Sequence, residues 1–129
     1  MEEGQKIQEK ALKMQIIEQQ MAGMQKQLQQ LEQQLTELAI TKESLEDIKK
    51  CKEGSEMLSM LSPGIFIKTK LVQNQDVIIN VGGNVAVKKK VEHAKQMVEE
   101  QIQEIREVQL QFMTDMEKFN DAITKMEKE

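Results

Sequence analysis

Two segments of the chain carry apolar residues at spacings that alternate between three and four, which is the heptad pattern of coiled-coil helices. In the first segment, which Lys42 interrupts, the repeat falls at Met14, Ile17, Met21, Met24, Leu28, Leu31, Leu35, Leu38 and Leu45. In the second segment a seven-residue series comprises Val91, Val98, Ile105, Phe112, Phe119 and Met126, with a companion series at Ala94, Ile102, Val108, Met116 and Ile123. We therefore expect two long helices, over residues 5–52 and 90–128.

Between these helices the apolar period changes to two, which is typical of β-strands. Strand-like runs occupy residues 57–61, 65–71, 77–81 and 85–89. The turn sequences Ser62-Pro63-Gly64 and Gly82-Gly83-Asn84 join the first run to the second and the third to the fourth. Residues 57–89 are therefore expected to form two β-hairpins.

Because the hairpin region reverses the direction of the chain, the two helices are expected to pack antiparallel. Pairing residues whose numbers add up to 143 places apolar side chains opposite each other, for example Leu45 and Val98. The predicted fold class is α+β: a long antiparallel two-helix coiled coil with two β-hairpins at the end opposite the termini, forming one domain over residues 1–129. Ser44 is a candidate cap for a restart of the first helix, close to the break in the repeat at Lys42.

Composition narrows the function classes. The 129 residues include no Trp, no Tyr and 31% charged residues, which suits exposed helices with one apolar stripe. A net charge of −4 argues against a nucleic-acid partner, and we interpret Lys88-Lys89-Lys90 as the solvated start of a helix. No apolar stretch approaches the roughly 20 residues that span a bilayer, and the acidic N-terminus is not a signal peptide. One cysteine cannot form an internal disulfide, so we expect a cytoplasmic protein without membrane contact.

The sequence contains no recognisable catalytic or ligand-binding motif. His93 is the only histidine and has no second metal-ligand type spaced around it, and Cys51 has no histidine near it in sequence. Gly82-Gly83-Asn84 lacks the Gly-Lys-Ser/Thr ending of a phosphate-binding loop, so we interpret it as a turn. We expect no enzymatic activity, no metal and no cofactor.

The hairpins pose a physical problem that assembly would solve. A lone hairpin is marginally stable in water, and two hairpins on one chain expose strand edges and an apolar face. Because the helices use their apolar stripes on each other, we expect the hairpins of several subunits to join. The residues expected in this assembly surface are Met57, Leu61, Ile65, Ile67, Val77, Ile79, Val81, Val85 and Val87.

Residues 1–24 and 112–129, which we call the tips, are rich in methionine. Seven of the ten methionines and two of the three phenylalanines lie there: Met1, Met14, Met21, Met24, Met113, Met116, Met126, Phe112 and Phe119. Methionine is flexible and polarizable, and it suits surfaces that accommodate many partners. The alternative is ordinary coiled-coil core, which we favour for Met24, Phe112 and Phe119, whereas Met113 lies off the stripe and should face outward. The candidate binding residues are Met14, Ile17, Met21, Met24, Phe112, Met113, Met116, Phe119, Ile123 and Met126.

With this layout in place, the chain resembles the prefoldin family, and within it the α-type subunits, over nearly its whole length. The most specific segments are Glu53–Leu58, Gly64–Lys68 and Val77–Lys89. Two hairpins distinguish α-type from β-type subunits of the family, which have one. Family members usually carry a Val-Pro step in the first strand, where this chain has Leu58-Ser59-Met60-Leu61.

The resemblance implies a hexamer of two α-type and four β-type chains, in which hairpins build a double β-barrel and coiled coils extend as tentacles. It also implies an ATP-independent chaperone that captures unfolded client proteins at the tips and delivers them to a group II chaperonin. The rival interpretation is a structural coiled-coil spacer or filament former, and a weaker one is an adaptor for a single partner. The concentration of Met and Phe at the tips favours the chaperone.

Overall fold

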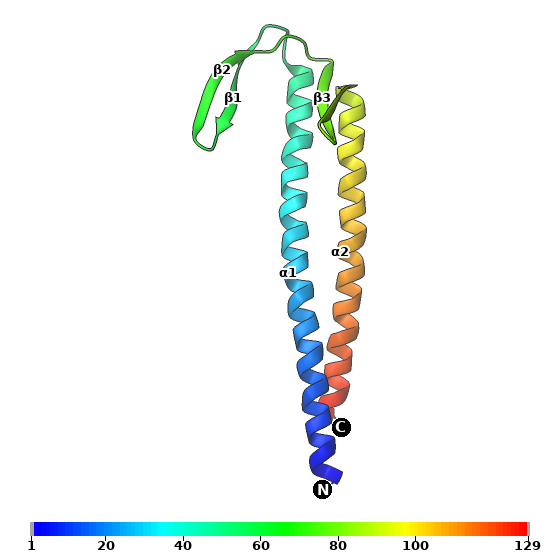
Figure 1. Ribbon diagram of the computed structural model, residues 1–129. Coiled ribbons are helices and arrows are strands. Elements are labelled where there is room, and N and C mark those ends of the chain that lie inside the picture. Colours follow the sequence, from blue (N-terminus) through cyan, green and yellow to red (C-terminus); the bar gives the residue numbers. More distant parts are fainter. Residues whose placement is uncertain (1, 129) are drawn as a thin grey trace. The chain divides into compact units, whose positions relative to one another are not determined.

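The computed structural model describes residues 2–128 and has the predicted order of helix, two hairpins and helix. Its elements are α1 (Glu2–Lys50), β1 (Glu56–Ser62), β2 (Ile65–Lys70), β3 (Asp76–Gly82), β4 (Val85–Lys90) and α2 (Val91–Lys128) (Figure 1). The two long helices and the two antiparallel hairpins are thus confirmed. The expected helix restart at Ser44 is wrong, because α1 runs through this residue without a break and buries its neighbour Leu45.

The chain divides into two units. The tip unit consists of residues up to Thr36 and from Gln103 onward, and the hairpin unit consists of Glu37–Ile102. In neither unit do the described residues include a helix that is long and apolar enough to cross a membrane.

In the hairpin unit, the ends of α1 and α2 meet in a small apolar core. Its buried members are Leu45 of α1 and Val91, Ala94 and Val98 of α2. The half-buried side chains packed against them are Leu38, Val77, Ile79 and Ile102. Since Val77 and Ile79 belong to β3, the second hairpin rests on the helix pair of its own chain. Burying one such aliphatic side chain in full stabilises a fold by about 1.5–3 kcal/mol.

Three ion pairs flank this core and fix the direction of the helices. They join Lys42 to Glu99 at 3.4 Å, Lys95 to Glu46 at 3.0 Å, and Lys49 to Glu92. As the residue number rises along α1 it falls along α2, so the helices are antiparallel. Lys42, which interrupts the apolar repeat, is accommodated because its ammonium reaches a carboxylate of α2. The hydrogen bond from Lys95 lowers the pKa of the Glu46 carboxyl, because it stabilises the charged form.

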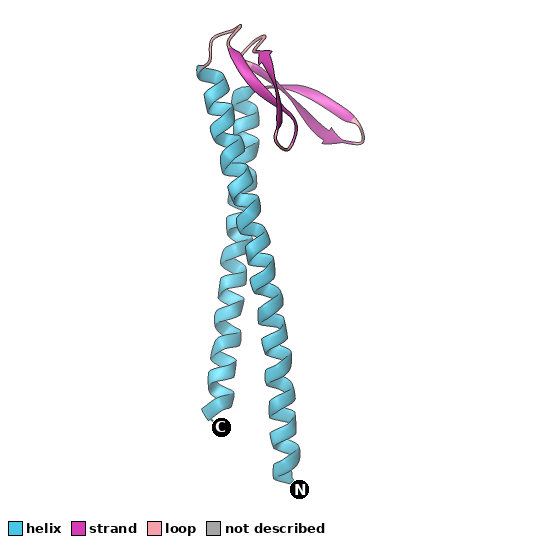
Figure 2. Cartoon of the chain, turned by 90° about the vertical axis from the view of Figure 1, so that its left-hand side faces the viewer, coloured by secondary structure: helices cyan, strands magenta, loops and turns pink. Residues whose placement is uncertain are grey.

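The two hairpins have the same internal pairing. In the first, Glu56 lies opposite Lys70, and in the second, Asp76 lies opposite Lys90. The register shifts once in each hairpin, between Met60 and Ser62 and between Asn80 and Gly82, which leaves Leu61 and Val81 as bulge residues. Each hairpin is a separate two-stranded sheet (Figure 2).

Turn chemistry explains why the hairpins close where they do. Gly83 and Asn84 have φ angles of 60° and 61°, which is the left-handed pair that a two-residue type I′ turn requires. Pro63 fixes φ near −65° at the corresponding place in the first hairpin, and Gly64 follows with φ 85°. Glycine and asparagine are the residues that adopt such angles most readily.

The two hairpins repeat one 20-residue structural unit, although their sequences are identical at only two positions, Lys68/Lys88 and Lys70/Lys90. Residues 51–70 and 71–90 each comprise a five-residue connector followed by a fifteen-residue hairpin, and together they fill the chain between α1 and α2. The strand starts differ by 76 − 56 = 20, and so do the bulge residues, 81 − 61. One difference between the two units concerns docking on the helices: Ile79 of β3 corresponds to Ser59 of β1, whose hydroxyl lies 2.8 Å from that of Thr69.

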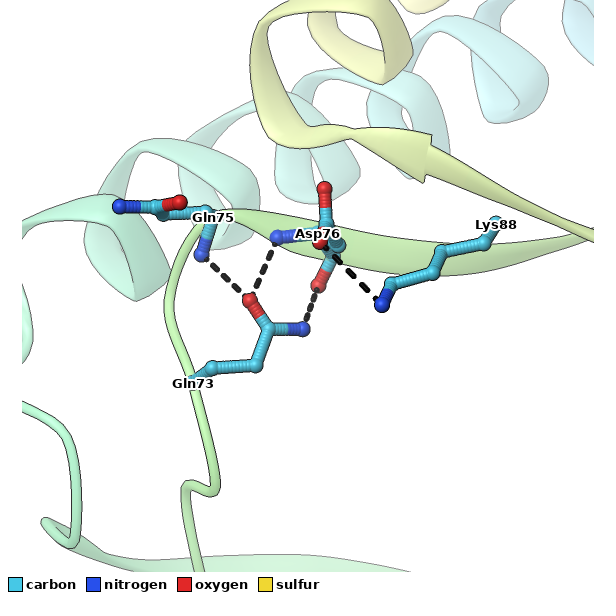
Figure 3. A network of polar contacts seen from close by, with 4 residues as sticks. All are labelled: Gln73, Gln75, Asp76 and Lys88. Atoms are coloured by element: carbon cyan, nitrogen blue, oxygen red, sulfur yellow. Dashed lines mark hydrogen bonds and ion pairs between the residues drawn. The ribbon is translucent and has the colours of Figure 1, made fainter.

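The second connector anchors the hairpin that follows it. The Gln73 side-chain oxygen accepts hydrogen bonds from the backbone N–H groups of Gln75 and Asp76, both at 2.8 Å, and its amide donates to the Asp76 carbonyl (Figure 3). Lys88 Nζ lies 3.5 Å from Asp76 Oδ2. The Gln73 side chain therefore holds the backbone at the start of β3, and Lys88 holds the Asp76 carboxylate.

Asn74 of the same connector caps the end of α1. Its Nδ2 donates to the carbonyl of Cys51 at 2.7 Å and to that of Lys49 at 3.4 Å. The last carbonyls of a helix have no partner within the helix, so an amide donor placed there satisfies them. On the other side, the N–H of Val91, the first residue of α2, donates to the carbonyl of Gln75 at 2.8 Å. The connector thus ties the end of one helix to the start of the other.

Candidate functional site

The tip unit is a pair of antiparallel helix segments whose facing side chains form a seam. Gln109 Nε2 of α2 donates a hydrogen bond to Glu32 Oε2 of α1 at 3.1 Å. Met126, near the end of α2, borders a hollow together with Ile7 and Lys10 of α1. Residue numbers therefore rise along one segment as they fall along the other, and both views show the segments side by side (Figures 1 and 2).

Nine of the ten candidate binding residues lie in this seam and are half-buried. They are Met14, Ile17, Met21, Met24, Phe112, Met116, Phe119, Ile123 and Met126. Within residues 2–128 the four buried side chains, Leu45, Val91, Ala94 and Val98, all belong to the hairpin unit, so the seam keeps an accessible edge. Two helices cover each other from one side only, which explains the partial exposure. Met1, also counted among the methionines of the tips, lies outside the described residues.

The seam departs from the expected positions at one place. Val108, expected in the companion series, is 42% exposed, and Gln109 is half-buried in its stead. Ile105, Gln109 and Phe112 follow one another at spacings of four and three, which keeps them on one face of a helix with 3.6 residues per turn. The expectation for Val108 is therefore wrong, and the seam contains a polar layer there.

An open apolar groove of about 540 Å³ runs beside the seam. Its lining residues come from both helices: Met21, Leu28, Leu110, Met113, Thr114, Met116, Glu117 and Asn120. Met113 is 59% exposed, as its position off the stripe predicts, and Leu110 is 65% exposed. The groove therefore joins two seam methionines to an outward-facing apolar pair one helical turn apart.

Sequence analysis did not single out Leu110. A signal was present, because Leu110 and Met113 are apolar residues three apart on the face next to the seam. Ile7, Leu12 and Ile16 of α1 are further exposed apolar residues of the tip unit that the heptad pattern does not contain.

A second hollow of the tip unit is basic. It has a volume of about 360 Å³ and is lined by Lys6, Ile7, Glu9, Lys10, Lys13 and Met126. The tip unit thus holds two hollows of different charge, both bordered by methionine.

The residues expected in the assembly surface fall into two groups. Val77 and Ile79 pack against the helices of their own chain, and Val87 is half-buried. The others are exposed: Met57, Leu61, Ile65, Ile67, Val81 and Val85. A role of both groups in assembly stays a prediction, and for Val77 and Ile79 a role inside the chain is evident.

The first hairpin presents apolar side chains on both faces. Alternation along the strands places Met57 and Ile67 on one face, and Leu58, Met60 and Phe66 on the other. All of these side chains are exposed. The alternation in the sequence was interpreted as one apolar face per hairpin, so the second apolar face was not predicted.

The described residues offer little for catalysis or metal binding. Cys51 is exposed, and within residues 2–128 no three His, Cys, Asp or Glu side chains gather into a group that would hold a metal ion. The groove of the tip unit is an apolar surface bordered by the polar residues Thr114 and Asn120 and by the carboxylate of Glu117.

Comparison with known proteins agrees with this description. The sequence model of a family described as Prefoldin subunit matches residues 17–129. Prefoldin subunit alpha of Methanosphaera stadtmanae is 29% identical over 99 residues, which cover 77% of this chain and 70% of that protein. Prefoldin subunit alpha of Archaeoglobus fulgidus is 28% identical over 103 residues, covering 80% of this chain and 75% of that protein.

A solved structure has the same fold. A chain of the filamentous PFD from Methanocaldococcus jannaschii, determined by cryo-electron microscopy, aligns with a TM-score of 0.78. The alignment covers 89% of this chain and 95% of the other, at 18% sequence identity. At that identity the likeness supports the arrangement of helices and hairpins.

Proposed function

The chain belongs to the prefoldin family, and from this premise we propose that it is an α-type subunit of a cytoplasmic, ATP-independent chaperone. Its partners are β-type subunits, in a hexamer of two α-type and four β-type chains joined through their hairpins. The tip unit captures unfolded client proteins, which the complex passes to a group II chaperonin. No step of this function calls for catalysis, a nucleotide or a cofactor.

One observation carries the proposal: beside the seam of the tip unit an apolar groove opens, and two of its lining residues, Leu110 and Met113, are exposed. A purely structural coiled coil gains most by burying its seam and keeping its flanks polar. Here Leu110 and Met113 leave an apolar flank in water instead. Each arm alone would bind weakly, and several arms together would hold a client through effective concentration.

The hairpins support the assembly part of the proposal. Both faces of the first hairpin expose apolar side chains, and its strand edges have no neighbour within the hairpin unit. Exposed edges and faces of this kind are stabilised when strands of other chains join them.

The test measures client capture by the complex of this chain with a β-type partner. A chemically denatured protein is diluted into the complex without ATP, and light scattering reports its aggregation. We expect the wild-type complex to suppress scattering, and a variant with Leu110→Gln and Met113→Gln to require a roughly threefold to tenfold higher concentration, which corresponds to about 1 kcal/mol of lost contact. Its mass should equal that of the wild type, because both residues lie outside the hairpins.

Ile40→Gln is the matched control, since Ile40 is an equally exposed apolar residue of α1 outside the groove. Suppression that stays unchanged in the groove variant would contradict capture at this surface. A well-assembled wild-type complex that suppresses nothing would reject the chaperone and leave the alternative, a filament-forming spacer. The filamentous PFD with the same fold makes that alternative worth testing by electron microscopy of the chain alone.

A further inference from the structure

The groove beside the seam is acidic in its surroundings. Residues 14–28 of α1 and 107–120 of α2, which contain all eight of its lining residues, hold four acidic side chains and two lysines, Lys26 and Lys118. The four are Glu18, Glu107, Asp115 and Glu117. These 29 residues (15 + 14) therefore carry a formal charge of −2, half that of the whole chain, and Glu117 is the one charged side chain among the residues that line the groove.

One of these carboxylates belongs to the groove itself. Glu117 lines it beside Met113 and Met116, and its side chain is exposed. An exposed carboxylate at the rim of an apolar surface attracts cations within about 8 Å at physiological salt, the range over which charges act there. An apolar segment that enters the groove with a lysine or arginine next to it would gain this attraction, and one flanked by acidic residues would be repelled.

From this complementarity we propose that the groove selects apolar client segments flanked by basic residues, with Glu117 as the residue that determines the preference. The inference rests on the proposed chaperone function and adds the chemical class of segment that this surface takes. The hollow lined by Lys6, Lys10 and Lys13, with Glu9 beside them, differs from the groove in charge.

The experiment uses two fluorescein-labelled peptides with the same leucine- and phenylalanine-containing core. One is flanked by four lysines and the other by four glutamates. Fluorescence anisotropy gives their affinities for the complex of this chain with its β-type partner, at low, physiological and high salt. Because only this chain is altered between samples, differences report its contribution rather than that of the partner.

We expect Glu117→Lys to weaken binding of the lysine-flanked peptide and to strengthen binding of the glutamate-flanked one. Solvent-exposed charge pairs are weak, so the ratio of the two affinities should change about two- to fivefold and return to the wild-type value at high salt. Glu117→Gln should give half of this effect or less. Glu117 is exposed, so neither change is expected to disturb folding, which circular dichroism verifies.

Glu100→Lys makes the same change of net charge and is the matched control. Glu100 is exposed and lies ten residues before Leu110 on α2, on the order of 15 Å along the helix, which exceeds the screening length. An affinity ratio that Glu117→Lys and Glu100→Lys alter equally would overturn the assignment to Glu117. Tight binding of both peptides with no dependence on Glu117 would overturn charge selection and leave the chaperone function standing. Absence of both peptide binding and aggregation suppression in the wild type would overturn both.

Discussion

Asn74 shows how much one amide contributes to this fold. It is the side chain that reaches the carbonyls of Cys51 and Lys49 at the end of α1. Replacing Asn74 by Ala should lower the free energy of unfolding by about 0.5–1.5 kcal/mol, since one net hydrogen bond is lost and the carbonyls keep access to water. Urea unfolding measures the change. Gln75→Ala is the control, because Gln75 takes part through its backbone, and an equal loss in both variants would argue against the cap.

At the same scale, the sequence predicted some side chains well and others poorly. Met113 is exposed because it stands off the heptad stripe, and this follows from spacing alone. Hydrophobicity does not explain why Gln109 lies in the seam while Val108 is exposed, since valine is the more apolar of the two residues. What decides it is the helical period of 3.6, which brings residue 109 toward α1, where Glu32 accepts its hydrogen bond.

Among the elements, the two hairpins differ in what they contact. Ile79 of β3 packs against the helix core, and its counterpart in β1 is Ser59, which shares a hydrogen bond with Thr69 instead. Replacing Ile79 by Ser should therefore lower the free energy of unfolding by about 1–2 kcal/mol through lost burial. The comparison is Ile78→Ser on the other face of β3, where the side chain is 77% exposed and little change is expected. Denaturant titrations of both would reveal a wrong assignment of faces if Ile78→Ser cost more.

The elements themselves were predictable from the sequence, and their contacts were not. Periods of 3.6 and 2, with Pro63-Gly64 and Gly83-Asn84 as turn residues, predict the helices and hairpins with their bounds displaced by three residues at most. Both hairpins have the same alternation, so period alone cannot tell which one rests on the helices. Ile79 and Ser59 distinguish the two hairpins. That Ile79 marks the docked hairpin is seen only once the core that it packs against, which contains Leu45 and Val98, is known.

For the whole molecule, the repeat within the hairpin unit allows a test of what each hairpin does. Deleting residues 51–70 joins Lys50 to Leu71 and removes the first unit together with Cys51, one acceptor of the Asn74 amide. The second unit keeps Val77 and Ile79, which dock it on the helices. Helical content and unfolding midpoint should stay close to wild type, and the mass of the assembly with the β-type partner should fall. Deleting residues 71–90 removes the docked hairpin and should lower stability as well. Circular dichroism and light-scattering mass measurements distinguish these outcomes, and equal stability of both deletions would refute the difference in docking.

The 20-residue unit also has a consequence for how such chains change over evolutionary time. Because the first unit follows the last residue of α1 and the second ends at the residue before α2, gaining or losing one unit leaves both helix sequences intact and in phase. Loss of one unit converts a chain with two hairpins into a chain with one, and gain of one unit gives a chain with three. The number of strand edges in such a chain is thus a heritable trait that can vary in whole steps, independently of the two helices.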